Sequence, residues 1–208
     1  MQKTAAPIGP TINRLRERLD SWLGHPKRSF KEGRVTLVYR FLSEDPEPLP
    51  LRLKVEINSR EHFSVLGFQS KELEVRSRWF AGSSRVSTYA LEELLGTKLR
   101  ALYQRRKGRD LFDLWWASEH AEVDFDRVVH CFGEYLEAEG RRVSRAELEA
   151  NLEAKLKDPR FVADLQLLLA PEIEWDLGAA ARWISDEITP RLGGEPWKGL
   201  EEPDGGAG

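Results

Sequence analysis

From residue 34 onward, the apolar residues of this chain change their spacing once, from every second position to every third or fourth, and this change limits the folds open to it. Between residues 34 and 58, two segments alternate apolar and polar side chains around a proline-rich stretch. This pattern predicts two antiparallel strands with one packed and one open face. From Thr88 onward the spacing is helical. Strands followed by helices predict an α+β protein, with a small, mainly antiparallel N-terminal sheet and a helical C-terminal half.

The remaining elements follow from the same patterns. A helix is expected from about Ile12 to Leu23, a third strand around 73–79, and a long helix capped by Thr88. The Lys107-Gly108 step should end that helix, and a second one should run from near Asp110. Further helical patterns cover about 124–139, 144–156, 158–169 and 176–189. We therefore expect a strand-containing lobe over 1–87, a helical lobe over 88–192 and a disordered tail over 193–208.

Composition excludes several classes of function. The 208 residues carry a formal net charge of −3, so any nucleic-acid contact must depend on local charge. The single cysteine, Cys131, excludes an internal disulfide, and no apolar run reaches the roughly 20 residues of a membrane span. A cytoplasmic location is expected. The chain has no phosphate-binding glycine loop, no G-x-S-x-G, no H-E-x-x-H and no metal-ligand spacing of histidines, which argues against kinase, hydrolase and zinc chemistry.

Two charged residues fall where apolar residues are expected. Lys98 lies on the apolar stripe of its helix, four residues before Leu102. Either it reaches solvent at the edge of the stripe, or it is directed at a polyphosphate. Asp110 lies in the first turn of the next helix, four residues before Leu114. It is either a helix-terminal carboxylate or a site residue, and Asp113 is expected to pair with a nearby basic residue.

Charge also gathers in two other places. Six of the twelve residues from Lys98 to Arg109 are basic. Such a run is either a solvated helix face or, together with Tyr103, a contact for phosphates and stacked bases. Glu56 lies on the polar face of its strand, beside Lys54. It forms either a salt bridge across the sheet or an oxygen ligand for Mg²⁺.

Three segments together resemble the AbiEii/AbiGii nucleotidyltransferase toxins: the strand 53–58, the stretch 89–98, and the stretch 99–114. The resemblance runs from about residue 1 to residue 190, and 98–113 is its most specific part. It implies a nucleotidyltransferase-like fold in which carboxylates hold Mg²⁺ and organise a nucleoside triphosphate for attack at its α-phosphate. It also implies a toxin–antitoxin or abortive-infection system, a cognate antitoxin, an RNA acceptor with tRNA as the candidate, and neither a DNA nor a membrane partner.

The resemblance assigns roles to five residues of this chain. Glu56 matches a metal-binding carboxylate, Lys98 a lysine that contacts the nucleotide, and Asp110 an essential aspartate that follows an arginine. Arg105 and Arg109 are further candidates for contacts with the nucleotide phosphates. Lys98 and Asp110 are therefore the expected catalytic residues, and Glu56 is the expected metal ligand.

The chain departs from the family pattern before Glu56. Residues 1–55 contain neither the Gly-Gly/Ser turn nor the Asp-x-Asp pair that supplies two further metal carboxylates. The expectation is a transferase that is truncated at its N-terminus and inactive as given. The alternative is a remnant that only binds an antitoxin or an RNA. The DNA upstream of the Met1 codon distinguishes the two, because an in-frame Asp-x-Asp there favours the enzyme.

Overall fold

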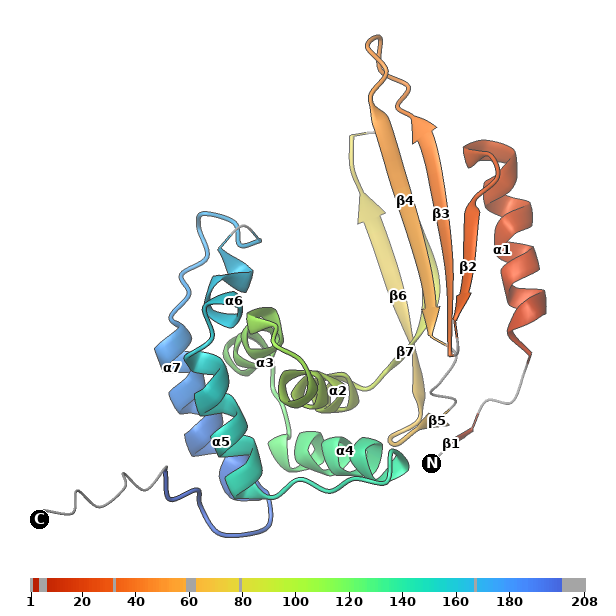
Figure 1. Ribbon diagram of the computed structural model, residues 1–208. Coiled ribbons are helices and arrows are strands. Elements are labelled where there is room, and N and C mark those ends of the chain that lie inside the picture. The colour runs from red at the N-terminus through yellow and green to blue at the C-terminus, as the bar shows by residue number, and fades with distance from the viewer. Residues whose placement is uncertain are drawn as a thin grey trace, which may run out of the picture. The chain divides into compact units, whose positions relative to one another are not determined.

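The computed structural model describes residues 2–3, 7–31, 33–58, 63–78, 80–166 and 168–199. The chain divides into two compact units, Met1–Ser64 and Val65–Gly208. It is an α+β protein, in which the described strands lie before residue 90 and every described helix but α1 (Ile8–Leu23) lies after it (Figure 1). None of the described helices combines the length and apolar character that crossing a membrane requires.

The first unit is a three-stranded antiparallel sheet with one helix against it. Its strand order is β2 (Lys27–Lys31), β3 (Arg34–Leu42), β4 (Pro50–Asn58), and helix α1 spans Ile8–Leu23. Val35, Leu37 and Tyr39 of β3 are buried, whereas the residues between them are partly or fully exposed. The sheet therefore has one face packed on α1 and one open face, as the alternating sequence predicts. A short pair, β1 (Gln2–Lys3) with β5 (Phe63–Ser64), completes the unit.

A polar contact joins α1 to the packed face of this sheet. The Tyr39 hydroxyl is buried and donates a hydrogen bond to Asp20 of α1 at 2.9 Å. Burial and the neighbouring carboxylate together raise the pKa of Tyr39 to about 12. Arg16 also donates to Asp20, at 2.8 Å. The apolar contact between helix and sheet thus contains a satisfied polar group, as a buried hydroxyl requires.

The second unit opens with a two-stranded hairpin, β6 (Phe68–Arg76) with β7 (Ala81–Tyr89), whose residues are mostly exposed. The Glu93 carboxylate, fully buried, accepts hydrogen bonds from the backbone amides of Val65 and Leu66, at 2.8 and 3.0 Å. It also accepts one from the Tyr135 hydroxyl at 2.8 Å. One buried carboxylate therefore ties the start of the unit to its helical core.

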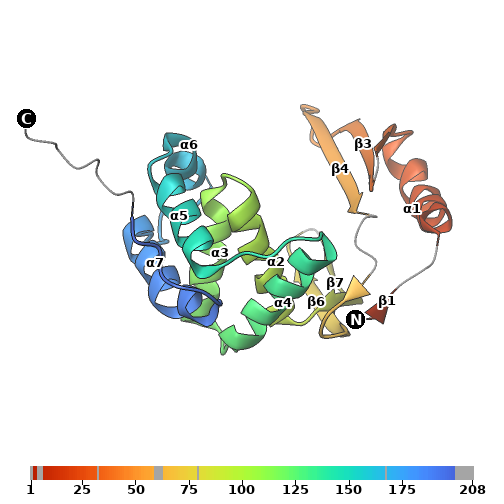
Figure 2. The same ribbon diagram turned by 60° about the horizontal axis from the view of Figure 1, so that its bottom comes forward.

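Figure 2 shows the helices of this unit gathered together. They share one apolar core that includes Leu99, Leu114 and Phe132. Their bounds are α2 Leu91–Gln104, α3 Gly108–His120, α4 Phe125–Ala138, α5 Arg145–Leu156, α6 Pro159–Val162 and α7 Leu177–Trp183. Short turns of other helix types follow α6 and α7: η1 Ala163–Leu165, η2 Ile184–Ile188 and η3 Thr189–Arg191. Side-chain caps begin several helices, most completely at Ser144, which forms a capping box with Glu147.

Helices α2 and α4 approach each other closely at Gly96. A Cβ atom at this position would lie 2.7 Å from Cβ of Cys131 and 2.9 Å from the Val128 carbonyl oxygen. Cys131 itself is fully buried, and burial raises the pKa of its thiol to about 12. The cysteine is thus a core residue of the interface between the two helices.

Several expectations from the sequence need correction. Thr88 does not cap α2, because it lies in β7, paired with Gln69, and α2 begins at Leu91. The third expected strand corresponds to β6, but it pairs only with β7 and does not join the sheet of the first unit. Of the expected tail, residues 193–199 are described, and the backbone amide of Trp197 donates to Glu149 at 2.7 Å. Residues 200–208 and Trp79 lie outside the described residues. The division between the compact units falls after Ser64; the boundary expected between a strand-containing and a helical lobe, at 87/88, stays a prediction.

Candidate functional site

The candidate site lies where α2 ends and α3 begins. Helix α2 stops at Gln104, and Arg105 has an extended backbone. Gly108 starts α3 at a point where a Cβ atom would lie 2.5 Å from the Phe161 carbonyl oxygen. Only glycine fits so close to another backbone, which explains the break predicted at Lys107-Gly108. The tight corner brings Asp110, in the first turn of α3, next to the end of α2.

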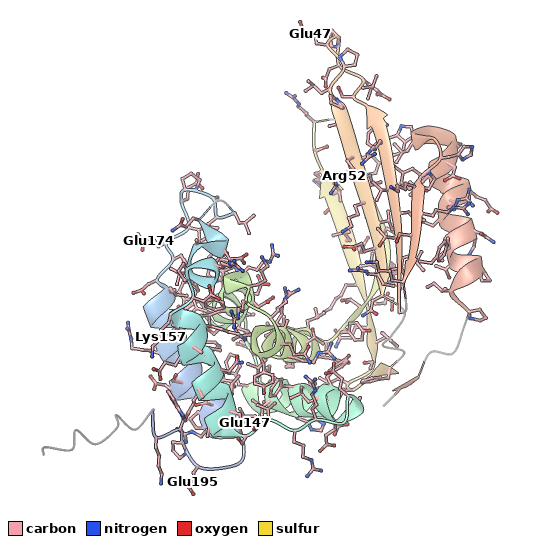
Figure 3. All side chains as sticks on the ribbon, in the orientation of Figure 1. Glu47, Arg52, Glu147, Lys157, Glu174 and Glu195 are labelled. Carbon is pink, nitrogen blue, oxygen red and sulfur yellow. The ribbon has the colours of Figure 1, made fainter. Side chains whose placement is uncertain are left out.

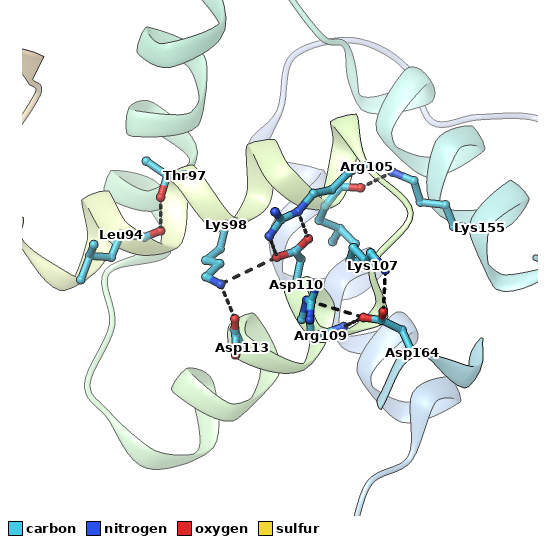
Figure 4. A network of polar contacts seen from close by, with 11 residues as sticks. Leu94, Thr97, Lys98, Arg105, Lys107, Arg109, Asp110, Asp113, Lys155 and Asp164 are labelled. Atoms are coloured by element: carbon cyan, nitrogen blue, oxygen red, sulfur yellow. Dashed lines mark hydrogen bonds and ion pairs between the residues drawn. The ribbon is translucent and has the colours of Figure 1, made fainter. Parts of the chain in front are cut away.

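Asp110 and Arg105 form the central pair of the site (Figure 4). Nε and Nη2 of Arg105 donate to the two carboxylate oxygens of Asp110, each at 2.6 Å. The Asp110 side chain is fully buried, whereas 51% of the Arg105 side chain is exposed. The hydrogen bond with Asp110 raises the pKa of Arg105 above its ordinary value. A two-point contact of this kind fixes the plane of the guanidinium group.

Lys98 joins this pair from the middle of α2. Its Nζ lies 3.7 Å from Asp110 and 2.5 Å from Asp113, one turn further along α3. The Lys98 side chain is 39% exposed, so it reaches solvent from the edge of the apolar stripe. The pairing expected for Asp113 is confirmed. Two cations and two carboxylates thus meet at one exposed corner of the helical unit.

The other cations of the basic run also have acidic partners. The Arg100 side chain lies 3.1 Å from Glu139, and Arg106 lies 3.1 Å from Asp158. Asp164 receives both Lys107, at 3.0 Å, and Arg109, at 3.8 Å. Burial opposes ionisation of Asp164, but the hydrogen bonds from the Lys107 side chain and the Arg109 amide outweigh it and hold the pKa of this carboxyl below its usual value. The run is therefore largely neutralised by its own unit.

Lys155, on α5, contacts the C-terminal end of α2 from the interior of the helical unit. The residue is 4% exposed, and its ammonium donates to the carbonyl oxygens of Leu102 and Tyr103, the latter at 2.7 Å, and to Asn151 at 2.5 Å. These carbonyls belong to the last turn of α2, where backbone acceptors lack helical donors. Burial lowers the pKa of Lys155 to about 8, although the nearby Asp110 opposes this shift. Sequence reasoning overlooked Lys155, Asp164 and Glu93, whose partners lie far away along the chain.

Glu56 lies in the first unit, on the open face of the sheet. Its carboxylate is 2.9 Å from Lys54 and 3.6 Å from Arg34. The hydrogen bond from Lys54 is the main cause that lowers the pKa of Glu56. Among the described residues, no group of three or more His, Cys, Asp or Glu side chains could hold a metal ion. A single carboxylate between two cations does not fit a Mg²⁺ site, so these residues do not form one by themselves.

The chain matches, over residues 4–183, the family described as Nucleotidyl transferase AbiEii toxin, Type IV TA system. The chain belongs to this family. No curated protein and no solved structure gives a match. AbiEii proteins are nucleotidyl transferase toxins of type IV toxin–antitoxin systems, and membership implies a cognate antitoxin.

The structure brings together three of the five residues that the sequence assigned to this AbiEii site. Lys98, Arg105 and Asp110 meet at the corner between α2 and α3. Arg109 is directed at Asp164 instead. Glu56 belongs to the other unit. Lys98, Arg105 and Asp110 are therefore the best-defined part of the candidate site.

Proposed function

We propose that this AbiEii chain supplies the nucleotide-binding part of a nucleotidyltransferase that acts on an RNA acceptor, with tRNA as the first candidate. Lys98 and Arg105 bind the triphosphate, and Asp110 positions Arg105. The fixed guanidinium carries the proposal. Two of its nitrogens are held by the buried Asp110 carboxylate, so its remaining edge meets solvent in a defined orientation. An oriented guanidinium beside a half-exposed ammonium suits the oxygens of a polyphosphate.

We also propose that the 208 residues bind the nucleotide without transferring it. Nucleotidyl transfer of this type needs carboxylates that hold a metal ion. Residues 1–55 contain no Asp-x-Asp, and Glu56 is paired with cations. The same observation favours the second candidate function, a protein that acts only by binding RNA or its antitoxin.

Nucleotide binding tests the first part of the proposal. A labelled triphosphate should bind more weakly by about tenfold to Lys98→Ala and to Arg105→Ala, since each loses one charge-assisted contact. Arg106→Ala is the matched control, because it removes the same charge from the same loop but from a side chain that pairs with Asp158 and takes no part in the cluster of Lys98, Arg105 and Asp110. Its affinity should stay within about twofold of the parent. Each variant is measured at a temperature at which circular dichroism shows it folded. Equal losses in all three variants would contradict the assignment.

A transfer assay tests the second part. The chain is incubated with α-labelled triphosphates, Mg²⁺ and total tRNA, and the RNA is examined for label. No label should appear. Robust labelling that Glu56→Ala abolishes would show that the chain has a working metal site and that it is an active enzyme.

A further inference from the structure

The open face of the first unit's sheet carries a concentration of positive charge. The strand register places six basic side chains and one acidic side chain, Glu56, on this face. The six are Lys27 and Lys31 of β2, Arg34 and Arg40 of β3, and Arg52 and Lys54 of β4. All six are exposed, and Figure 3 shows Arg52 projecting from β4. The chain as a whole has a net charge of −3, so this face differs sharply from the average surface.

Most of this charge has no acidic partner. Glu56 pairs with Arg34 and Lys54. Within the described ranges, the other four cations, Lys27, Lys31, Arg40 and Arg52, form no ion pair. In the basic run of the helical unit, by contrast, each cation has a carboxylate within 4 Å. Among the described residues, the open face of the sheet therefore carries more unpaired positive charge than the basic run from Lys98 to Arg109.

Two like-charged pairs lie directly opposite each other on neighbouring strands. Arg40 is the register partner of Arg52, and Lys31 is the partner of Arg34. Like charges in this position destabilise a sheet, so the arrangement is unfavourable in the isolated unit. Arg40 and Arg52 are also the two polar residues among those that line a surface pocket of about 350 Å³; its other lining residues are apolar (Phe41, Leu42, Pro50 and Leu51). An anion bound between the two arginines would turn the repulsion into attraction.

We propose that this open face binds the phosphate backbone of the acceptor RNA, which extends the proposed function to the way the acceptor is held. Arg34 and Arg40 lie six residues apart on β3, which corresponds to about 20 Å along a strand. The cations therefore form an extended surface, too long for one triphosphate and suited to successive phosphates of a polynucleotide. On β3 the side chains that alternate with the cations pack in one apolar cluster with α1, so this central strand gives the cations a rigid support. Contacts of this kind bind the backbone without reading its sequence.

The experiment compares two double variants that remove the same charge from the same unit. Arg40→Ala with Arg52→Ala clears the like-charged pair from the open face. Arg14→Ala with Arg18→Ala is the matched control, because these exposed arginines lie on α1, which covers the opposite face of the sheet. Binding of a fluorescein-labelled single-stranded RNA is measured by anisotropy at several salt concentrations. Arg40→Lys with Arg52→Lys keeps the charge and serves as a rescue.

The open-face variant should bind RNA at least tenfold more weakly at low salt. Its slope of log affinity against log salt should be shallower by about 1.4, because each phosphate contact on a single strand contributes about 0.7. The control and the lysine variant should stay within about threefold of the parent. The melting temperature of the open-face alanine variant should not fall, because its two substitutions remove a repulsive pair from the sheet.

Three results would overturn the proposal: equal losses in the two alanine variants, unchanged binding in the open-face variant, or a polyglutamate peptide of equal charge binding as tightly as RNA. The readout is independent of transfer. Loss of RNA binding at the open face alone supports the surface even if no nucleotide is transferred. If the chain transfers nucleotides but all variants bind RNA equally, the proposed RNA-binding surface is refuted and the proposed transferase function is not.

Discussion

The pair of Arg105 and Asp110 gives the sharpest test of how the candidate site is built. Removing one partner of a buried ion pair costs about 3–5 kcal/mol, because the other charge is left without compensation. Here Arg105 is 51% exposed, and Lys98 remains 3.7 Å from the carboxylate. Water and Lys98 should therefore offset about half of the free-energy cost of leaving the Asp110 carboxylate without Arg105. We expect Arg105→Ala to lower the free energy of unfolding by about 2 kcal/mol.

A double-mutant cycle separates this effect from the loss of the arginine's own packing. In Arg105→Ala with Asp110→Ala no charge is stranded, so the double variant should be no less stable than Arg105→Ala alone. The coupling energy should exceed about 1 kcal/mol, well above the roughly 0.5 kcal/mol expected of independent sites. Lys98→Ala should couple to Asp110→Ala more weakly, because its ammonium is 3.7 Å from Asp110 and closer to Asp113.

Urea unfolding followed by tryptophan fluorescence is a suitable assay, since all tryptophans except Trp22 lie in the helical unit. Arg106 and Asp158, a neighbouring pair whose arginine is 74% exposed, provide the control cycle, with a coupling below about 1 kcal/mol. If the effects of Arg105→Ala and Asp110→Ala simply add, the buried carboxylate does not depend on the guanidinium. The proposal that Asp110 holds the Arg105 guanidinium in a fixed orientation for binding phosphate would then fail.

Two further outcomes follow from buried groups. Burial lowers the pKa of Lys155 from 10.5 to about 8, so between these pH values the unfolded chain binds more protons than the folded chain. The unfolding free energy of the parent should therefore rise by up to about 3 kcal/mol relative to that of Lys155→Met as the pH increases from 8 to 10.5. A difference between the two that stays flat or falls over this range would contradict the burial of the Lys155 charge. Gly96→Ala should lower the unfolding free energy by about 1–2 kcal/mol, because the added Cβ would collide with Cys131. Gly133→Ala, on α4 with open space around it, should leave the unfolding free energy unchanged or raise it by up to about 1 kcal/mol. Calorimetry on both variants measures the difference.

The sequence predicted those elements whose apolar pattern is strong. Strands β3 and β4, whose sequences alternate apolar and polar residues, and helices α1 to α5 correspond closely to their expected ranges. It missed β2 and β7, because the five residues of β2 contain one apolar side chain and β7 is rich in serine. Such strands owe their existence to backbone pairing with a neighbour, which spacing along the chain does not reveal. For the same reason Thr88, a plausible helix cap by composition, is a strand residue.

The site was predictable only in its local part. The position of Lys98 on an apolar stripe and of Asp110 in a first turn, four residues before Leu114, indicated both as candidate site residues; Asp110 is fully buried, whereas Lys98 reaches solvent. The two-point contact between Arg105 and Asp110 depends on the Gly108 corner, which spacing indicates only as a break. The partners that neutralise Arg100, Arg106 and Lys107 lie 39 to 57 residues further along the chain. Such pairs are set by tertiary packing, so the basic run looked more available for RNA than it is.

The buried Cys131 has a practical consequence for spectroscopy. A thiol reacts with maleimide reagents as the thiolate, and a pKa of about 12 together with full burial leaves almost none available at neutral pH. A single cysteine introduced at Ser29, exposed between Lys27 and Lys31 on β2, would therefore be the one rapidly labelled thiol of the folded chain. An environment-sensitive dye attached there would report polyanion binding in real time with the native cysteine left in place.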